Sequence, residues 1–158
     1  FGMNVEGGIG FHVGNEKAVF APFVELGWKW WRRDIADSTY RDGGGIAQNA
    51  IGYSELWSMI FAKAGAYGSV NIAQSSFATI EAGVLYPFYT KNRMGLFSIE
   101  VEPKGQLSPF VEVGINIKKF RVSAYYESLR FDKSSVVRGF YQPESKMDVF
   151  GGKIGVSF

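Results

Sequence analysis

Side chains of two kinds alternate strictly along several stretches of this chain. Between positions 20 and 30, one set is mainly large and apolar, and the other holds the charged residues and a glycine. The first set is Phe20, Pro22, Val24, Leu26, Trp28 and Trp30, and the second is Ala21, Phe23, Glu25, Gly27 and Lys29. The same two-residue period returns at 5–13, 78–86, 111–117 and 150–158. A helix with about 3.6 residues per turn would not keep such sets on separate faces, so the pattern predicts amphipathic β-strands.

Composition narrows the class of protein further. The 158 residues suffice for one domain, taken as 1–158, and 46% of them are hydrophobic, yet the mean hydropathy is only −0.03. Apolar residues are therefore dispersed among polar ones, and no run approaches the roughly 20 residues that a membrane helix needs. The absence of cysteine excludes disulfides and thiolate metal sites, and a net charge of +2 is too small to indicate nucleic-acid binding.

The alternation and the polar segments between apolar stretches predict where the strands lie. The expected strands are 1–13, 18–31, 43–53, 57–68, 75–88, 94–103, 107–117, 119–131 and 146–158. Short turns are expected at 14–17, 90–93 and 118–119, and longer polar segments at 32–42 and 132–145. Short turns at one end and long loops at the other are typical of outer-membrane barrels.

The number of strands is left with two solutions. Nine is an odd number, which a single-chain bacterial barrel does not have. Either a further strand precedes Phe1, giving ten, or one of the nine is wrongly assigned, giving eight, which is the preferred prediction. The weakest assignment surrounds Ser54, because Ser54-Glu55 followed by Leu56, Met59 and Ile60 also matches a capped amphipathic helix.

A charged residue followed two positions later by glycine recurs six times inside the expected strands. The pairs are Glu6/Gly8, Glu25/Gly27, Lys63/Gly65, Glu81/Gly83, Glu112/Gly114 and Lys153/Gly155. Residues two apart share a face of a strand, and glycine leaves room there for a long neighbouring side chain. Because acidic and basic members can pair, we expect a charge network in the interior. Its expected members are Glu6, Glu25, Lys63, Glu81, Glu100, Glu102, Glu112, Arg121, Glu127 and Lys153.

Alternation alone does not tell which face is enclosed, so a soluble sheet with solvated charges is the alternative. Glycine recurs on the charged face, although it is a poor residue for an exposed strand surface. The apolar face carries Trp28 and Trp30 at one rim and Tyr86 and Phe88 at another, like the aromatic girdles of membrane proteins. These features favour a transmembrane antiparallel up-and-down β-barrel over a soluble one.

Two kinds of segment resemble known sequences. The final strand, Phe150-Gly-Gly-Lys-Ile-Gly-Val-Ser-Phe158, resembles the C-terminal assembly signal of outer-membrane barrels, with Phe158 as its closing residue. The internal segments 22–28, 61–67 and 109–115 resemble strands of the small OmpA-like outer-membrane β-barrel superfamily. The resemblance implies residence in the bacterial outer membrane, insertion by the barrel-assembly machinery, contact with outer-membrane lipid and lipopolysaccharide, and both chain ends in the periplasm. It implies no single function, because these barrels serve as anchors, adhesins, channels and enzymes.

Few residues offer catalytic or metal-binding chemistry. His12 is the only histidine, so any Ser–His or Asp–His arrangement would depend on it, and a histidine metal cluster is excluded. Glu100 and Glu102 share a strand face about 7 Å apart, which would also suit glycoside chemistry. The many other charges favour the interior network instead, so no catalytic residue, metal or cofactor is expected.

Basic residues flank the expected long loops. They are Arg32, Arg33 and Arg41 in one loop, and Arg130, Lys133 and Arg138 in another. Such side chains could bind lipid phosphate groups through charge-assisted hydrogen bonds, whereas ordinary solvated loop charge is the simpler alternative.

The leading functional hypothesis is a non-enzymatic outer-membrane barrel with a charged, side-chain-filled lumen. Its role would be structural or surface-interacting, through long loops whose partner the sequence does not identify. A small channel or porin is the first alternative, favoured if ten strands leave an open path. A lipid A-modifying enzyme and a soluble ligand-binding barrel are further alternatives, and no nucleic-acid partner is expected.

Overall fold

Every regular element of the described chain is a β-strand. The computed structural model describes residues 1–41, 47–95 and 98–156, with the backbone alone at positions 40, 41, 47, 48 and 50. The strands are β1 (Gly2–Gly10), β2 (Val13–Gly14), β3 (Ala18–Ile35), β4 (Ser38–Arg41), β5 (Ala47–Ala50), β6 (Tyr53–Ala73), β7 (Ser76–Met94), β8 (Ile99–Val101), β9 (Ser108–Ile117), β10 (Phe120–Phe131) and β11 (Ser145–Val156). No helix in these ranges is long and apolar enough to cross a bilayer. The predicted all-β class is confirmed.

The main sheet has an antiparallel up-and-down topology. Its long strands follow one another in the order β1-β3-β6-β7-β9-β10-β11, and each pairs antiparallel with its neighbour. The short strands β2 and β8 pair with β3 and β7, which brings this sheet to nine strands, while β4 and β5 form a separate two-stranded sheet. The predicted topology is therefore confirmed, and β3, β6 and β7 are longer than expected.

The predicted eight-stranded closed barrel is not what the described residues form. The strand order ends at β1 on one side and at β11 on the other, without a ladder between them. Seven long strands that reverse at every step leave β1 and β11 running in the same direction, so the two cannot extend the antiparallel ladder directly. The sheet is nevertheless strongly coiled, because side chains from both of its edges, including Met3 and Val149, line one cavity.

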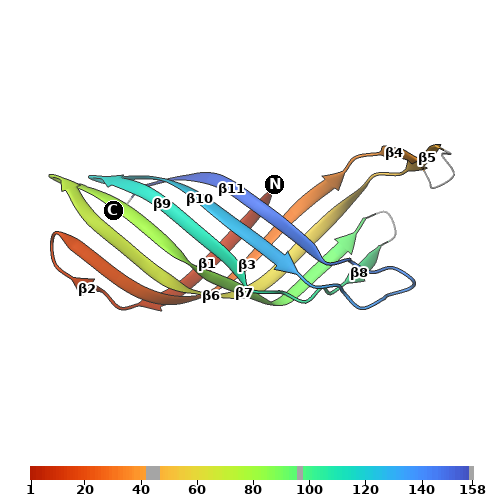
Figure 1. Ribbon diagram of the computed structural model, residues 1–158, viewed down its shortest axis with the longest axis horizontal. Helices are drawn as coiled ribbons and strands as arrows, with labels where there is room; N and C mark the ends of the chain where they lie inside the picture. Colours follow the sequence, from red (N-terminus) through yellow and green to blue (C-terminus); the bar gives the residue numbers. More distant parts are fainter. Residues whose placement is uncertain (42–46, 96–97, 157–158) are drawn as a thin grey trace.

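The two ends of the sheet differ as the sequence predicts. One end carries the tight connections 15–17, 74–75 and 118–119, and the other carries the β4–β5 hairpin, the β8 region and the segment 132–144 (Figure 1). At the first turn, the Asn15 side chain accepts hydrogen bonds from the backbone N–H groups of Lys17 (2.9 Å) and Ala18 (3.2 Å). Ser75 and Lys118 have φ angles of 61° and 53°, the left-handed conformation that a two-residue hairpin turn requires. The ends are called the turn end and the loop end below.

The middle of the chain departs from the prediction at several positions. The helix that was the alternative around Ser54 does not form, because β6 begins at Tyr53 and pairs along its length with β3 and β7. Within the predicted strand 43–53, the structure has β5 at 47–50 and the first residue of β6 at Tyr53, while 42–46 lie outside the described residues. The predicted turn at 90–93 lies inside β7, and the predicted loop 32–42 begins within β3. Long ladders on both sides satisfy these backbone groups, which outweighs the local turn preference of polar residues.

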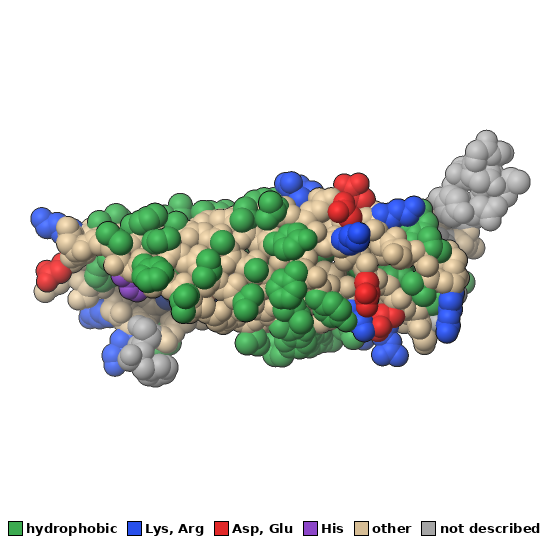
Figure 2. Space-filling model, turned by 90° about the horizontal axis from the view of Figure 1, so that it is seen from below, with side chains coloured by type: hydrophobic (Ala, Val, Ile, Leu, Met, Phe, Trp, Pro, Cys, Tyr) green, Lys and Arg blue, Asp and Glu red, His purple; other side chains and the backbone are tan. Residues whose placement is uncertain are grey.

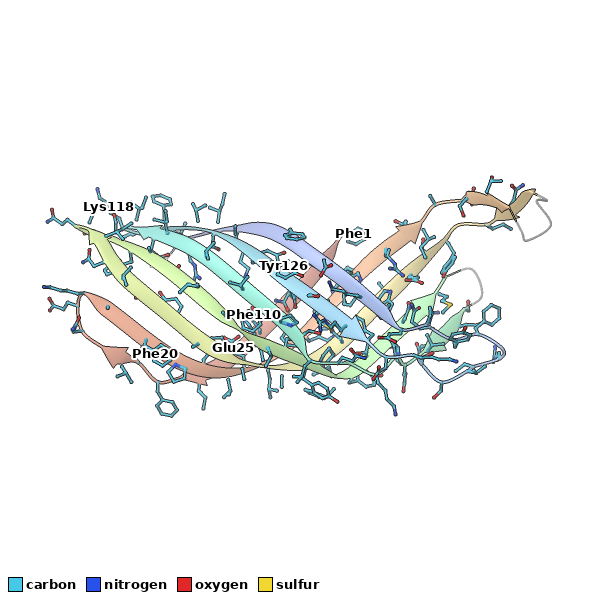
Figure 3. The ribbon with its side chains drawn as sticks, in the orientation of Figure 1. Phe1, Phe20, Glu25, Phe110, Lys118 and Tyr126 are labelled. Atoms are coloured by element: carbon cyan, nitrogen blue, oxygen red, sulfur yellow. The ribbon has the colours of Figure 1, made fainter. Side chains whose placement is uncertain are left out.

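The two faces of the sheet have opposite character. The enclosed face holds a buried cluster of Trp57, Met59, Phe61, Leu85, Phe110, Leu129 and Phe131. The outer face exposes apolar side chains on every long strand, and Leu26 is 62% and Ile154 84% exposed. Figure 2 shows these apolar side chains spread along the body of the molecule, with most charged ones toward its ends. Phe20 projects away from the sheet, whereas Glu25 and Phe110 lie on the enclosed side (Figure 3). The predicted assignment of faces is confirmed.

Candidate functional site: the charged interior

Lys63 on β6 lies at the centre of a cluster of three acidic side chains, each contributed by a different strand. Its Nζ lies 2.7 Å from Glu81 Oε1 on β7, 3.2 Å from Glu25 Oε2 on β3 and 3.7 Å from Glu6 Oε2 on β1. The Lys63 side chain is 10% exposed, and Nζ also lies 4.4 Å from the centroid of the Phe110 ring, a cation–π distance. One ammonium thus joins three carboxylates from strands far apart in the sequence.

Glu112 forms a second centre with the opposite sign. Its Oε2 accepts a hydrogen bond from Lys153 Nζ (2.6 Å), and its Oε1 accepts one from Arg121 Nη2 (2.9 Å). The Glu112 side chain is buried, while the two cations are partly exposed. Each carboxylate oxygen therefore has its own cationic donor, the arrangement that makes a buried charge tolerable.

Two further ion pairs lie closer to the loop end. Lys29 pairs with Glu127, whose carboxylate is buried. Arg33 donates to Glu55 Oε2 from Nε (3.0 Å) and Nη2 (2.6 Å). The same oxygen accepts a hydrogen bond from Trp57 Nε1 (2.8 Å). Glu55 is 1% exposed, so its charge depends on these donors.

The repeated glycines make room for side chains of adjacent strands. A Cβ at Gly27 would lie 2.3 Å from the Phe61 ring, and one at Gly65 would lie 3.0 Å from the Phe23 ring. Among the charged residues, only Glu25 is accommodated in this way, because a Cβ at Gly8 would lie 2.4 Å from its Cγ. The sequence prediction that each glycine accommodates the charge on its own strand is therefore wrong in its details. Glycine instead allows large rings from the next strand to fill the interior.

Eight of the ten residues expected in the interior network lie on the enclosed face and make ion pairs there. They are Glu6, Glu25, Lys63, Glu81, Glu112, Arg121, Glu127 and Lys153. Glu100 does not belong to the network, because it lies on the outer face of β8 and pairs with Lys91 Nζ at 2.6 Å. Glu102 follows β8 and is exposed. Both were misassigned because β8 is short and placed by its pairing with β7, which the local pattern does not specify.

Three members of the interior network were not among the predicted residues. Lys29 and Arg33 share the face of Glu25, so strict counting by two along β3 would have found them. The sequence did not place Glu55 on either face, because a helix after Ser54 was still an alternative to a strand. All three lie beyond the glycine-containing motif, on which the prediction depended.

The six basic residues predicted at the rim do not form one cluster. Arg32 lies on the outer face, with Nε 3.0 Å from Asp34 Oδ1, whereas Arg33 lies on the opposite face and pairs with Glu55. Arg130 and Arg138 are exposed, and Lys133 Nζ lies 4.4 Å from the Tyr141 ring centroid. The side chain of Arg41 lies outside the described residues, as does Phe158.

The charged interior holds a small cavity, and a larger one of about 370 Å³ lies between the two edges of the sheet, lined by side chains such as Lys29, Leu129 and Val149. Side chains of the network, including Glu6, Lys63, Glu112 and Lys153, line a cavity of about 150 Å³. His12 is exposed between β1 and β2, away from these carboxylates in the sheet. In the described part of the chain, no group of three or more His, Asp or Glu side chains is placed to hold a metal ion. The arrangement is suited to neutralising charge in an enclosed space rather than to acid–base or metal chemistry.

Fold and site together define a class: a coiled antiparallel up-and-down sheet with an apolar outer face and an ion-paired interior. No model of a known protein family matches this chain, and no curated protein matches it significantly.

Proposed function

We propose that this chain is embedded in the bacterial outer membrane as a β-barrel-type protein of the small OmpA-like kind. Its role is structural or surface-interacting, through the loop end, with a lumen that is filled rather than open. The observation that carries the proposal is the inverted distribution of side chains: apolar residues outside and ion pairs inside. A soluble sheet of this size would place its charges in water and its apolar rows in the core.

The dimensions of the outer apolar row support a membrane location. On β3 this row runs from Phe20 to Trp30, and an 11-residue strand is about 36 Å long at roughly 3.3 Å per residue. With the tilt of about 45° that is common for barrel strands, its height is about 26 Å, close to the apolar band of about 25 Å on outer-membrane barrels. Continuous exposed apolar surface of that extent is unusual on a soluble monomer.

The aromatic residues support the same orientation, although not in the predicted positions. The register of β6 with β3 and β7 places Tyr89 level with Trp28 through Ile60, and Tyr86 level with Leu26. Tyr86 therefore lies near the middle of the outer row. The aromatic belt consists of Trp28, Trp30 and Tyr89, which lie toward the loop end. The prediction of a separate rim for Tyr86 was wrong because β7 continues past position 93.

The filled interior favours a structural role over conduction. The ion pairs of Lys63 and Glu112 occupy the middle of the sheet, and large rings such as Phe61 and Phe110 occupy the space opposite glycines. An open pore would need a continuous water-filled path, and the network side chains lie across it.

The loop end supports an interaction role because its longest described loop, 132–144, is ordered by hydrogen bonds. The Ser134 backbone N–H donates to the Gln142 carbonyl (2.9 Å), and the Gln142 backbone N–H donates to Ser134 Oγ (2.8 Å). Asn92 on β7 donates to the Gln142 side chain (3.0 Å). Val136 and Tyr141 remain exposed on this ordered loop, so a partner would meet a pre-formed surface at a low entropic cost.

Folding into lipid vesicles followed by gel electrophoresis with and without boiling tests the membrane location. A folded, heat-modifiable band that resists protease in vesicles is the expected result, whereas a detergent-free monomer in buffer would refute the proposal. Planar-bilayer recording tests the filled lumen. Steady single-channel currents would replace the structural role by that of a small channel.

A further inference from the structure

The outer surface carries a groove at the loop end, and of the interior network only Glu55, which is 1% exposed and paired with Arg33, is among its lining residues. We name it the rim groove and define it by Trp28, Trp30, Arg32, Leu56, Ser58 and Arg93. These residues lie on the outer face of β3, β6 and β7, around a hollow of about 790 Å³. Its lining thus combines aromatic, aliphatic and cationic groups.

The backbone register places two arginines on either side of one leucine. Arg32 on β3 and Arg93 on β7 are both the direct neighbours of Leu56 on β6. Their Cα atoms are separated by two strand spacings, about 10 Å, so both long side chains can reach a group lying over Leu56.

Arg93 is the cation of this groove that has no protein partner. Two carboxylates are nearby on the outer face, but Asp34 is paired with Arg32 (3.0 Å) and Glu100 with Lys91 (2.6 Å). Among the described residues, no side chain or backbone group forms a hydrogen bond or ion pair with the Arg93 guanidinium, and Arg93 is exposed. A guanidinium beside apolar surface, with its donors free, is well suited to bind an anionic oxygen group bidentately.

The aromatic residues fix the level of the groove with respect to the proposed membrane. Trp28 and Trp30 lie just on the turn-end side of Arg32, and the Trp28 indole N–H donates to Ser58 Oγ (2.9 Å). Tryptophan side chains concentrate where hydrocarbon meets headgroups. The arginines therefore lie at headgroup height, immediately outside the aromatic belt.

A second, apolar hollow lies along β6 on the turn-end side of the rim groove. On the outer face of β6, Ala62 and Ala64 have small side chains. Larger side chains on the neighbouring strands, such as Leu26, Val84 and Tyr86, flank them around a hollow of about 490 Å³. This second groove lies nearer the turn end than the rim groove, and the Ile60 side chain on the same strand separates the two. Its lining side chains on the outer face are apolar, which suits a hydrocarbon chain.

We infer that the rim groove binds a phosphate-bearing anionic lipid, with the phosphate between Arg93 and Arg32 and an acyl chain along Ala62 and Ala64. The inference rests on the proposed membrane location and names the lipid contact more closely than the sequence did. Inorganic phosphate would satisfy the arginines but leave the apolar groove unused, and a neutral lipid would do the reverse.

Native mass spectrometry of the full chain in detergent tests this site. The probes are dioleoyl phosphatidic acid, diolein with the same chains but no phosphate, and inorganic phosphate. We expect phosphatidic acid to bind most tightly, and Arg93→Gln to weaken it about tenfold while leaving diolein unchanged. Arg130→Gln removes another exposed arginine at the loop end, outside the groove, and should change the affinity less than twofold. Ala62→Phe should weaken both lipids by filling the acyl groove.

Equal losses in Arg93→Gln and Arg130→Gln would show general charge attraction and overturn the inference. So would equal binding of diolein and phosphatidic acid, or inorganic phosphate that displaces the lipid at similar affinity. Vesicle insertion of the same variants separates the two proposals. Wild-type protein that does not insert refutes the membrane location, whereas normal insertion without lipid selectivity refutes only this site.

Discussion

Replacing Lys63 with methionine should destabilise the folded protein by about 3 kcal/mol. The substitution keeps the length of the side chain and removes its charge, which leaves Glu6, Glu25 and Glu81 without the ammonium that lies 3.7, 3.2 and 2.7 Å from them. Removal of one partner from a buried ion pair costs about 3–5 kcal/mol. The three carboxylate side chains remain 27%, 25% and 18% exposed, so water screens part of the cost and the lower value applies.

Urea titration of the protein folded in detergent micelles measures this loss, with tryptophan fluorescence and the heat-sensitive gel shift as independent probes. The transition midpoint should fall without a change in slope, because the folded state buries similar surface.

Lys91→Met provides the matched control, because Lys91 also pairs with a glutamate, Glu100, but on the outer face. Its side chain is 34% exposed and that of Glu100 is 45% exposed, so water screens this pair and its loss should destabilise the protein much less than that of Lys63. If Lys63→Met were as stable as Lys91→Met, the interior cluster would not stabilise the fold and the argument from it would be refuted.

Two further substitutions test the two faces of the sheet. Gly27→Val should cost about 1–3 kcal/mol in the same urea titration, because even a Cβ there would lie 2.3 Å from the Phe61 ring. Gly7→Ala, where no atom lies within 4 Å, is its control, and equal effects would contradict the steric role of Gly27. Leu26→Arg, midway along the outer row, should destabilise the protein in lipid vesicles by about 2–4 kcal/mol. A loss below about 0.5 kcal/mol in vesicles would indicate that this face meets water.

Local pattern was sufficient to predict that the chain forms amphipathic strands, which side chains of a strand share a face, and that the two ends of the sheet differ. The reason is that a strand has a period of two, so that Glu25, Gly27 and Lys29 must share a face whichever strand pairs with theirs. The same reasoning identified Lys63 and Glu112 as interior charges before any partner was known. The tight turns at 14–17 and 118–119 were also readable, because polar residues interrupt the alternation there.

Pairing between strands decided what the pattern left open. The helix-like segment after Ser54 is a strand because β3 and β7 offer it two complete ladders, and those ladders also carry β7 through the predicted turn at 90–93. Arg93 was therefore missed as an outer-face cation, and Glu100 was placed on the wrong side.

The sequence by itself determined which side chains share a face of a strand, because that depends only on alternation along one strand. The tertiary structure alone decided which charges meet, because the register between strands sets the partners of Lys63, Glu112 and Glu55. It also decided that seven long strands leave β1 and β11 parallel and unpaired with each other in the described chain. Register and strand direction arise from contacts distant in sequence, and no local pattern encodes them.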